Sequence, residues 1–197
     1  ILPFEKYKIT AGAKVSFTNT RNGINYDTSD PTLVQDDYFR YKEQIYALYA
    51  DYSREYSERF SMQLGLRMEH TRTTGISEAK DTEDKHDYTR LFPTVYLLYS
   101  PTDGHALNFS FSNRISRPSQ NMVNPFPFYQ NKYTYACGRE DLKPSYTYNV
   151  ELGYTLKNNF NVSAYYSYSD DVFFQVVDLD AETNVTSFLW ENFMQTH

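Results

Sequence analysis

Apolar residues recur at every second position along most of this chain, as in residues 60–69, FSMQLGLRME, and residues 146–156, YTYNVELGYTL. Successive side chains of a β-strand point to opposite faces, so this period indicates strands with one apolar and one polar face. The period of an amphipathic helix is almost absent. The pattern predicts an all-β protein of about eight strands, at residues 7–18, 38–53, 60–69, 88–100, 107–114, 146–156, 160–170 and after 184.

The strand at residues 38–53 allows two facings. The even positions from 46 to 52 are Tyr, Leu, Ala and Tyr, and the odd positions from 45 to 49 are Ile, Ala and Tyr. We favour the even set as the apolar face because the odd set continues into Asp51.

The register of one hairpin follows from the alternation. Residues that pair directly across two strands project to the same face, so Leu156 should pair with Phe160, which leaves KNN at 157–159 as a three-residue turn. The same register sets four further pairs: Tyr154 with Val162, Leu152 with Ala164, Val150 with Tyr166 and Tyr148 with Tyr168.

Long polar connections alternate with short turns between the predicted strands. The long ones are expected at about residues 20–37, 75–87 and 116–144, and the short ones at about residues 54–58, 101–105 and 157–159. An up-and-down meander with this alternation is typical of an outer-membrane barrel, whereas a Greek-key sandwich mixes loop lengths at both ends. We therefore expect an antiparallel up-and-down meander that is part of a transmembrane β-barrel, with residues 1–197 as a single barrel segment.

Strand length is also consistent with a bilayer. At about 3.3 Å per residue, residues 146–156 run about 33 Å, and a tilt of about 40° projects this to about 25 Å, the height of a barrel's apolar band. No stretch of the sequence approaches the run of about 18 apolar residues that a transmembrane helix needs.

Composition and charge narrow the choice of partners. The chain has 20 Tyr and 14 Phe but only 7 Gly and one Trp, which suits surfaces that are half apolar and half wet. Its net charge of −6 and its singly scattered basic residues argue against nucleic acid. The single Cys137 excludes an internal disulfide framework. We expect the chain to be a piece of a longer protein, since ILPFEKYK is no signal peptide and FMQTH no finishing element.

The polar faces of the strands carry charges that would line the lumen of a barrel. Arg67, Glu69, Arg114 and Glu151 are expected to point inward, toward a plug or a passing ligand. In a soluble sheet the same four residues would be ordinary solvent-facing charges.

The long connection at residues 112–144 carries the candidate ligand contacts. Its aromatic rings could stack on a glycan or a siderophore while its basic residues hydrogen-bond the ligand. The candidates are Arg114, Arg117, Phe128, Tyr129, Tyr133, Tyr135 and Arg139, with Phe126 and Lys132 as further possibilities. Alternatively, the rings and prolines of this connection pack it onto its own barrel rim.

Metal and catalytic signals are weak. The four His residues lie far apart, without a spacing such as HExxH. Residues 78–87, EAKDTEDKHD, could bind calcium loosely, but they lack the EF-hand pattern and are better explained as a charged surface loop. No GxSxG elbow or catalytic cysteine context occurs in the sequence. We expect no metal site, no cofactor and no catalytic residue.

Several stretches resemble TonB-dependent outer-membrane receptors, in particular the outer-membrane β-barrel type common in Bacteroides and relatives. They are YKEQIYALYADYS, FSMQLGLRMEHTRTTG, LFPTVYLLYS, FSNRISRPS with NPFPFY, and DLKPSYTYNVELGYTLKNNFNVSAYYSYSDDV. The resemblance covers about residues 38–177 and is most specific at RISRPS, NPF and DLKP.

The resemblance implies a barrel of about 22 strands in the Gram-negative outer membrane, closed by a plug domain and energised by TonB, that imports a siderophore, a glycan or a similar scarce ligand. Lipid, the plug, the TonB system and the ligand are the implied partners. The chain differs from this pattern, because it shows no plug, TonB box or terminal aromatic residue and has too few strands to close the barrel. GREDLKP also places Arg139 and Glu140 where the family has a GNPxLKP-like stretch.

Three other functions stay open at this point. They are a small closed outer-membrane barrel that acts as an adhesin or structural protein, a soluble carbohydrate-binding β-sandwich, and a barrel enzyme such as a lipase or protease. A piece of an open barrel should self-associate in water, because its edges and apolar face are bare.

Overall fold

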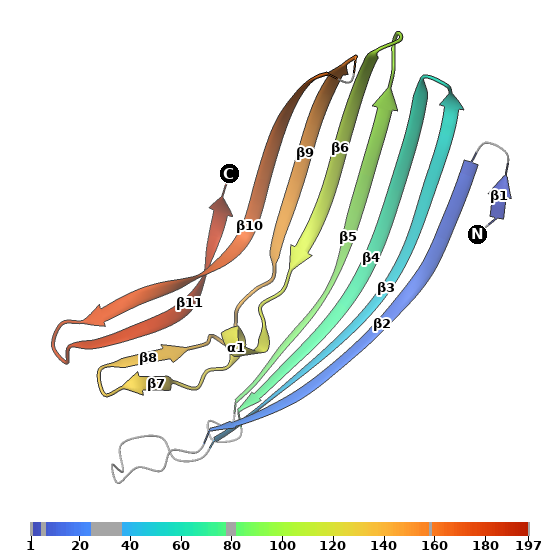
Figure 1. The fold of residues 1–197 in the computed structure, drawn as a ribbon. Helices are drawn as coiled ribbons and strands as arrows, with labels where there is room; N and C mark the ends of the chain where they lie inside the picture. Colours follow the sequence, from blue (N-terminus) through green and yellow to red (C-terminus); the bar gives the residue numbers. More distant parts are fainter. Residues whose placement is uncertain (1, 5–6, 25–36, 78–81, 158, 197) are drawn as a thin grey trace.

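The computed structural model describes residues 2–4, 7–24, 37–77, 82–157 and 159–196, and these form one curved sheet (Figure 1). Eight long strands make up its wall: β2 (Tyr7–Ile24), β3 (Asp37–Ser57), β4 (Phe60–Ser77), β5 (Thr82–Tyr99), β6 (His105–Ser116), β9 (Ser145–Leu156), β10 (Phe160–Asp180) and β11 (Val185–Thr196). Three short strands and one helical turn complete the described chain: β1 (Leu2–Phe4), β7 (Phe128–Asn131), β8 (Thr134–Cys137) and α1 (Gln120–Val123). The prediction of an all-β protein with eight wall strands is confirmed.

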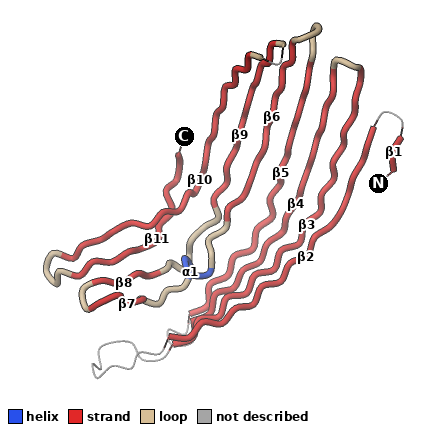
Figure 2. Tube along the Cα trace, viewed as in Figure 1, coloured by secondary structure: helices blue, strands red, loops and turns tan. Residues whose placement is uncertain are grey.

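The long strands form an antiparallel up-and-down meander. The order in the sheet is β1-β2-β3-β4-β5-β6-β9-β10-β11-β8-β7. The exception to the meander is the hairpin β7–β8, which belongs to the connection between β6 and β9 and adds to the edge of β11 through a parallel pairing of β8 (Figure 2). Among the described residues, no helix is long and apolar enough to cross a membrane.

Alternation gives the sheet one apolar and one polar face. One row of paired residues across seven strands is apolar throughout: Ile9, Tyr52, Leu64, Val95, Phe111, Val150 and Tyr166. The adjacent row is polar or small throughout: Thr10, Asp51, Gly65, Thr94, Ser112, Asn149 and Ser167. The preference for the even positions of residues 38–53 as the apolar set is therefore confirmed.

The predicted hairpin register is also confirmed. Leu156 pairs with Phe160, and Tyr148 pairs with Tyr168 with their ring centroids 6.1 Å apart. Lys157, at the start of the turn, has a φ of 48°, the left-handed conformation that a tight turn uses.

Two predicted loops and one turn were wrong in extent. Residues 75–87 are mostly strand, since β4 continues to Ser77 and β5 begins at Thr82, with Ser77 paired to Thr82. β2 continues to Ile24 and β3 begins at Asp37, so both ends of the connection predicted at residues 20–37 are strand, and the rest of it lies outside the described residues. The turn predicted at 54–58 is shortened because β3 continues to Ser57. Backbone pairing needs no apolar side chain, so strands continue through polar sequence where the apolar alternation has ended.

The apolar face is left bare by the rest of the described chain. Leu48, Leu66, Leu91 and Leu152 on this face are all exposed. The accessible area is 13435 Å², whereas a compact monomer of 23.2 kDa exposes about 9,700 Å². A sheet of this shape needs an apolar medium or a partner against one face.

Candidate functional site

The connection between β6 and β9, residues 117–144, folds over the polar face of the sheet. Phe39 on β3 packs there against Val123, Phe126 and Leu142 of the connection, and all four side chains are buried. The rings of Phe39 and Phe126 meet edge to face, with their centroids 6.2 Å apart. Tyr41, Met122, Phe173 and Trp190 surround this core. The main apolar core of the described chain therefore fixes this connection on the sheet.

Backbone hydrogen bonds give the connection a defined path. The amides of Gly138 and Arg139 donate to the carbonyls of Asn124 and Met122, each at 2.8 Å. A Cβ atom at Gly138 would lie only 2.3 Å from the carbonyl oxygen of Asn124. The glycine of GREDLKP is therefore required, because this close approach leaves no room for a side chain.

The far side of the connection is tied to β11. β8 pairs in parallel with residues 186–189, and the amide of Thr186 donates to the carbonyl of Tyr133 at 2.7 Å. Asn192 accepts a hydrogen bond from the Lys143 amide at 2.9 Å and donates to the Lys143 carbonyl at 3.1 Å. The connection thus spans the polar face from β4, where Arg117 binds, to β11.

A buried carboxylate anchors the near side of the connection. Glu69 on β4 is only 2% exposed and binds the guanidinium groups of both Arg67 and Arg117. Arg117 Nη2 lies 2.7 Å from Glu69 Oε2 and 3.1 Å from the hydroxyl of the fully buried Thr71, and its Nε lies 4.0 Å from Glu43. Arg117 is the first residue after β6, so this ion cluster holds the connection where it leaves the wall.

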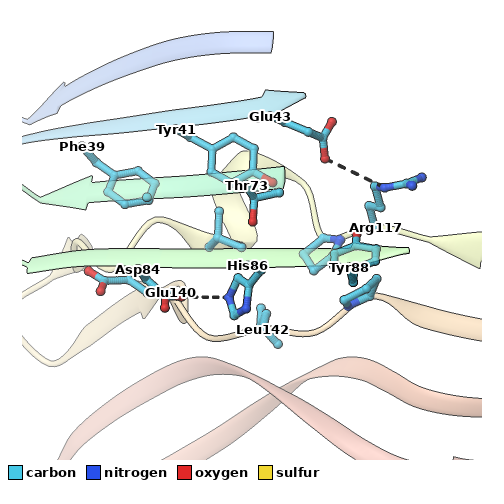
Figure 3. Close-up of a pocket in the computed structure, with 14 residues that line it drawn as sticks. Phe39, Tyr41, Glu43, Thr73, Asp84, His86, Tyr88, Arg117, Glu140 and Leu142 are labelled. Carbon is cyan, nitrogen blue, oxygen red and sulfur yellow. Dashed lines mark ion pairs between the residues drawn. The ribbon is translucent and has the colours of Figure 1, made fainter. Parts of the chain in front are cut away.

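A small cavity of about 30 Å³ lies between the connection and the sheet. Figure 3 shows Tyr41, Glu43 and Tyr88 from the wall facing Arg117, and His86 beside Asp84. His86 Nε2 lies 2.8 Å from Asp84 Oδ2. The cavity has room for about one water molecule, so it is a packing feature and too small for a nutrient.

The predicted ligand contacts fall into two groups. Phe128, Tyr129, Tyr133 and Tyr135 share the β7–β8 hairpin, where Phe128 and Tyr133 are 63% and 61% exposed and the rings of the other two lie 5.4 Å apart. Arg114 lies on β6, Arg117 is bound by Glu69, and Arg139 binds Asp141. Phe126 is buried in the core that holds the connection on the sheet, as the alternative of a connection packed by its own rings predicts.

The residues predicted to face the lumen lie on the polar face by strand alternation. Arg67 and Glu69 belong to the ion cluster, and Glu151 pairs with Ser110 and Tyr165. Glu43 and Arg90 lie on the same face and were not among the predicted residues. The alternation continued from Ile45 and Phe92 could have found both.

One carboxylate of the connection has a shifted pKa. Arg139 donates hydrogen bonds to Asp141 at 2.5 and 3.0 Å, and this lowers the pKa of the Asp141 carboxyl. The ion pair contributes fully above the ordinary carboxyl pKa of about 3.9, and the contribution is lost as the pH falls through the lowered value. Both side chains are exposed, so the contribution is small.

A curved antiparallel sheet that is apolar outside, polar inside and lined by a folded-in loop is the wall of a membrane β-barrel. The chain belongs to the outer membrane protein beta-barrel family, whose profile matches residues 1–197. This family places it in the Gram-negative outer membrane. Among curated protein sequences, none matches the chain.

Solved structures show the same fold at low sequence identity. The copper transporter OprC matches 96% of this chain with 31% of its own, at a TM-score of 0.68 and 12% identity. The Serratia marcescens hemophore receptor HasR, solved with its hemophore HasA and heme, matches 96% of this chain with 39% of its own length. Its TM-score is 0.59 and its sequence identity is 12%. The ferric yersiniabactin uptake receptor FyuA from Yersinia pestis matches 95% of this chain with 28% of its own length. Its TM-score is 0.55 and its sequence identity is 15%. The chain thus spans between a quarter and two fifths of these proteins.

Proposed function

We propose that this chain is part of the barrel wall of a TonB-dependent receptor that binds a scarce nutrient at the cell surface and imports it. The observation that carries the proposal is the connection 117–144, folded over the polar face of a sheet whose other face is apolar and bare. A wall segment with a structured loop inside the lumen suits a barrel that selects what passes. The similar structures, which are a copper transporter, a hemophore receptor solved with its hemophore and heme, and a ferric yersiniabactin uptake receptor, support the same class.

In this proposal each face has a separate role. The apolar face contacts lipid, and the polar face with Arg67, Glu69 and Glu151 borders a plug domain. The exposed rings of the β7–β8 hairpin, with Arg114 and Arg139, make contact with the ligand. No covalent chemistry is assigned to these residues.

The proposal favours a receptor wall over the alternatives. A soluble β-sandwich covers the apolar face of each sheet with a second sheet, and here Leu48, Leu66 and Leu152 are exposed. A small closed barrel of eight strands pairs its first and last strands, whereas here the edge of β11 pairs with β8.

Uptake by cells tests the proposal. A strain lacking the full-length protein is compared with the complemented strain for uptake of labelled ferric chelates, heme, copper and oligosaccharides, each with and without a protonophore. We expect uptake of one probe to require both the protein and the proton gradient. If deleting the protein left the uptake of every probe unchanged, the proposal would be refuted.

The aromatic hairpin gives a residue-level version of the same test. Phe128→Ala with Tyr133→Ala should reduce uptake at limiting probe by about tenfold, because each exposed ring contributes about 0.5–1.5 kcal/mol when it stacks on a ligand. Tyr99→Ala, which removes an exposed ring at the opposite end of the wall, is the matched control and should leave uptake unchanged.

A further inference from the structure

We propose that Arg67, Arg90 and Arg114 form an anion-binding site on the polar face, here called the arginine belt, and that the imported ligand is an anion. This inference rests on the proposed function, because it names the chemical class of the ligand. The belt differs from the aromatic hairpin in both position and chemistry.

The three arginines lie on the same face of three neighbouring strands, β4, β5 and β6. Arg67 on β4 pairs with Phe92 on β5, and Arg90 lies two residues further along β5 on the same face. Arg114 on β6 lies on the same face, two residues beyond Ser112, whose pairing with Thr94 is the last recorded between β5 and β6. Neighbouring strands lie about 4.8 Å apart where they pair, so side chains as long as Arg on β4, β5 and β6 can reach toward one ligand.

Two of the acids near the belt, Glu69 and Glu43, lie against arginines. Glu69, directly opposite Arg90, is buried and binds Arg67 and Arg117. Glu43 lies against Arg117, and Asp51 lies over Gly65 in the next row. Glu151 is level with Ser110, four residues along β6 from Arg114, or about 13 Å away.

Among the described residues, exposed cations without a carboxylate partner therefore remain on this part of the polar face. Arg90 and Arg114 are exposed, Arg67 is 45% exposed, and in the part of the chain that the structure describes no carboxylate pairs with Arg90 or Arg114. Lys14, in the row of Glu69 and Arg90, adds a fourth exposed cation. This concentration is notable in a chain whose net charge is −6.

Aromatic rings orient two of the guanidinium groups. Arg67 lies over the ring of Phe92 at 5.8 Å from its centroid, and Arg90 lies over the ring of Tyr146 at 4.9 Å. A stacked guanidinium that no carboxylate of the described residues binds, such as that of Arg90, keeps its N–H edge open for a carboxylate, phosphate or sulfonate, which it binds in a bidentate way. The belt therefore suits a ligand with two or more anionic groups on a planar frame.

Binding of a fluorescent trianion tests the belt without knowledge of the natural ligand. Pyranine, a planar pyrene with three sulfonates, is titrated against the full-length protein in nanodiscs and followed by fluorescence anisotropy. We expect binding that weakens with added salt, as contacts to charged groups do. Arg90→Gln with Arg114→Gln should weaken it at least about tenfold, since two charge-assisted contacts are lost.

The matched control removes two cations from the other face. Lys42→Gln with Arg72→Gln changes exposed residues at even positions of β3 and β4 and should leave pyranine affinity within about twofold. Three outcomes would overturn the belt. The intact protein does not bind pyranine, as when a plug covers the site; the variant with Arg90→Gln and Arg114→Gln loses less than about tenfold in affinity; or the control variant loses as much affinity as that variant. If the protein bound pyranine but supported uptake of no probe, only the proposed receptor function would be contradicted. If it supported uptake but did not bind pyranine, only the arginine belt would be contradicted.

Discussion

At the scale of single residues, strand alternation decides which medium a side chain meets. Leu152 is 53% exposed on the apolar face, and Thr155 lies on the polar face of the same strand. In the assembled barrel, Leu152→Arg should therefore cost about 2–4 kcal/mol of folding free energy, the cost of an Arg at the bilayer midplane, and Thr155→Arg should cost little. Urea unfolding of the full-length protein in lipid vesicles measures both. Equal costs at the two positions would contradict the facing.

Alternation predicts the face of a residue but not its distant partner. The pairing of Leu156 with Phe160 was predictable because three residues separate them. The binding of Glu69 by Arg117, 48 positions away, was not, because it depends on how the connection 117–144 folds back. In NPFPF, likewise, Phe126 is buried and Phe128 exposed, although each follows a proline.

At the scale of elements, the ion cluster of Arg67, Glu69 and Arg117 should hold the connection on the sheet. Glu69→Gln leaves two guanidinium groups close together without their carboxylate, a change that typically costs about 3–5 kcal/mol at a buried pair. The connection 117–144 should then detach from the sheet more often. Cys137, half-buried on β8 with its thiol donating to the Pro125 carbonyl at 3.1 Å, reports this.

The measurement is the rate of maleimide labelling at Cys137, followed by mass spectrometry of its peptide in the full-length protein. Glu69→Gln should raise the rate at least about tenfold, which corresponds to about 1.4 kcal/mol. Asp141→Asn removes only an exposed ion pair and should change the rate little. Similar rates in both variants would show that the apolar core alone holds the connection.

The parallel pairing of β8 with β11 can be tested by a disulfide. Cys137 pairs directly with Leu189, and neighbouring strands lie about 4.8 Å apart, within the Cα separation that a disulfide bridges. Leu189→Cys should therefore crosslink to Cys137 under mild oxidation. Ser187→Cys, opposite Tyr135, is too far along the strand and serves as the control. A crosslink yield that is no higher at residue 189 than at residue 187 would rule out this register.

At the scale of the whole molecule, the sequence predicted the wall and missed how its connection is placed. Eight strands, their facing and one hairpin register follow from local alternation, which repeats along each strand. The addition of β8 to β11 joins segments about 50 residues apart, and short polar strands such as FYQN and TYAC carry no alternation that names their neighbour. The assignment to the Bacteroides type of receptor stays a prediction.

The open shape of the sheet leads to a prediction for the isolated 197-residue chain. Its apolar row from Ile9 to Tyr166 has no covering layer among the described residues, and β1 and β7 are edge strands of the sheet. Bare edges and a large apolar face drive association in water. The refolded chain should therefore elute from size exclusion as oligomers, with masses from light scattering that rise with concentration. In dodecyl maltoside micelles, which cover the apolar face, the oligomers should become smaller, whereas a compact monomer in water without detergent would contradict the lipid-facing role of this row.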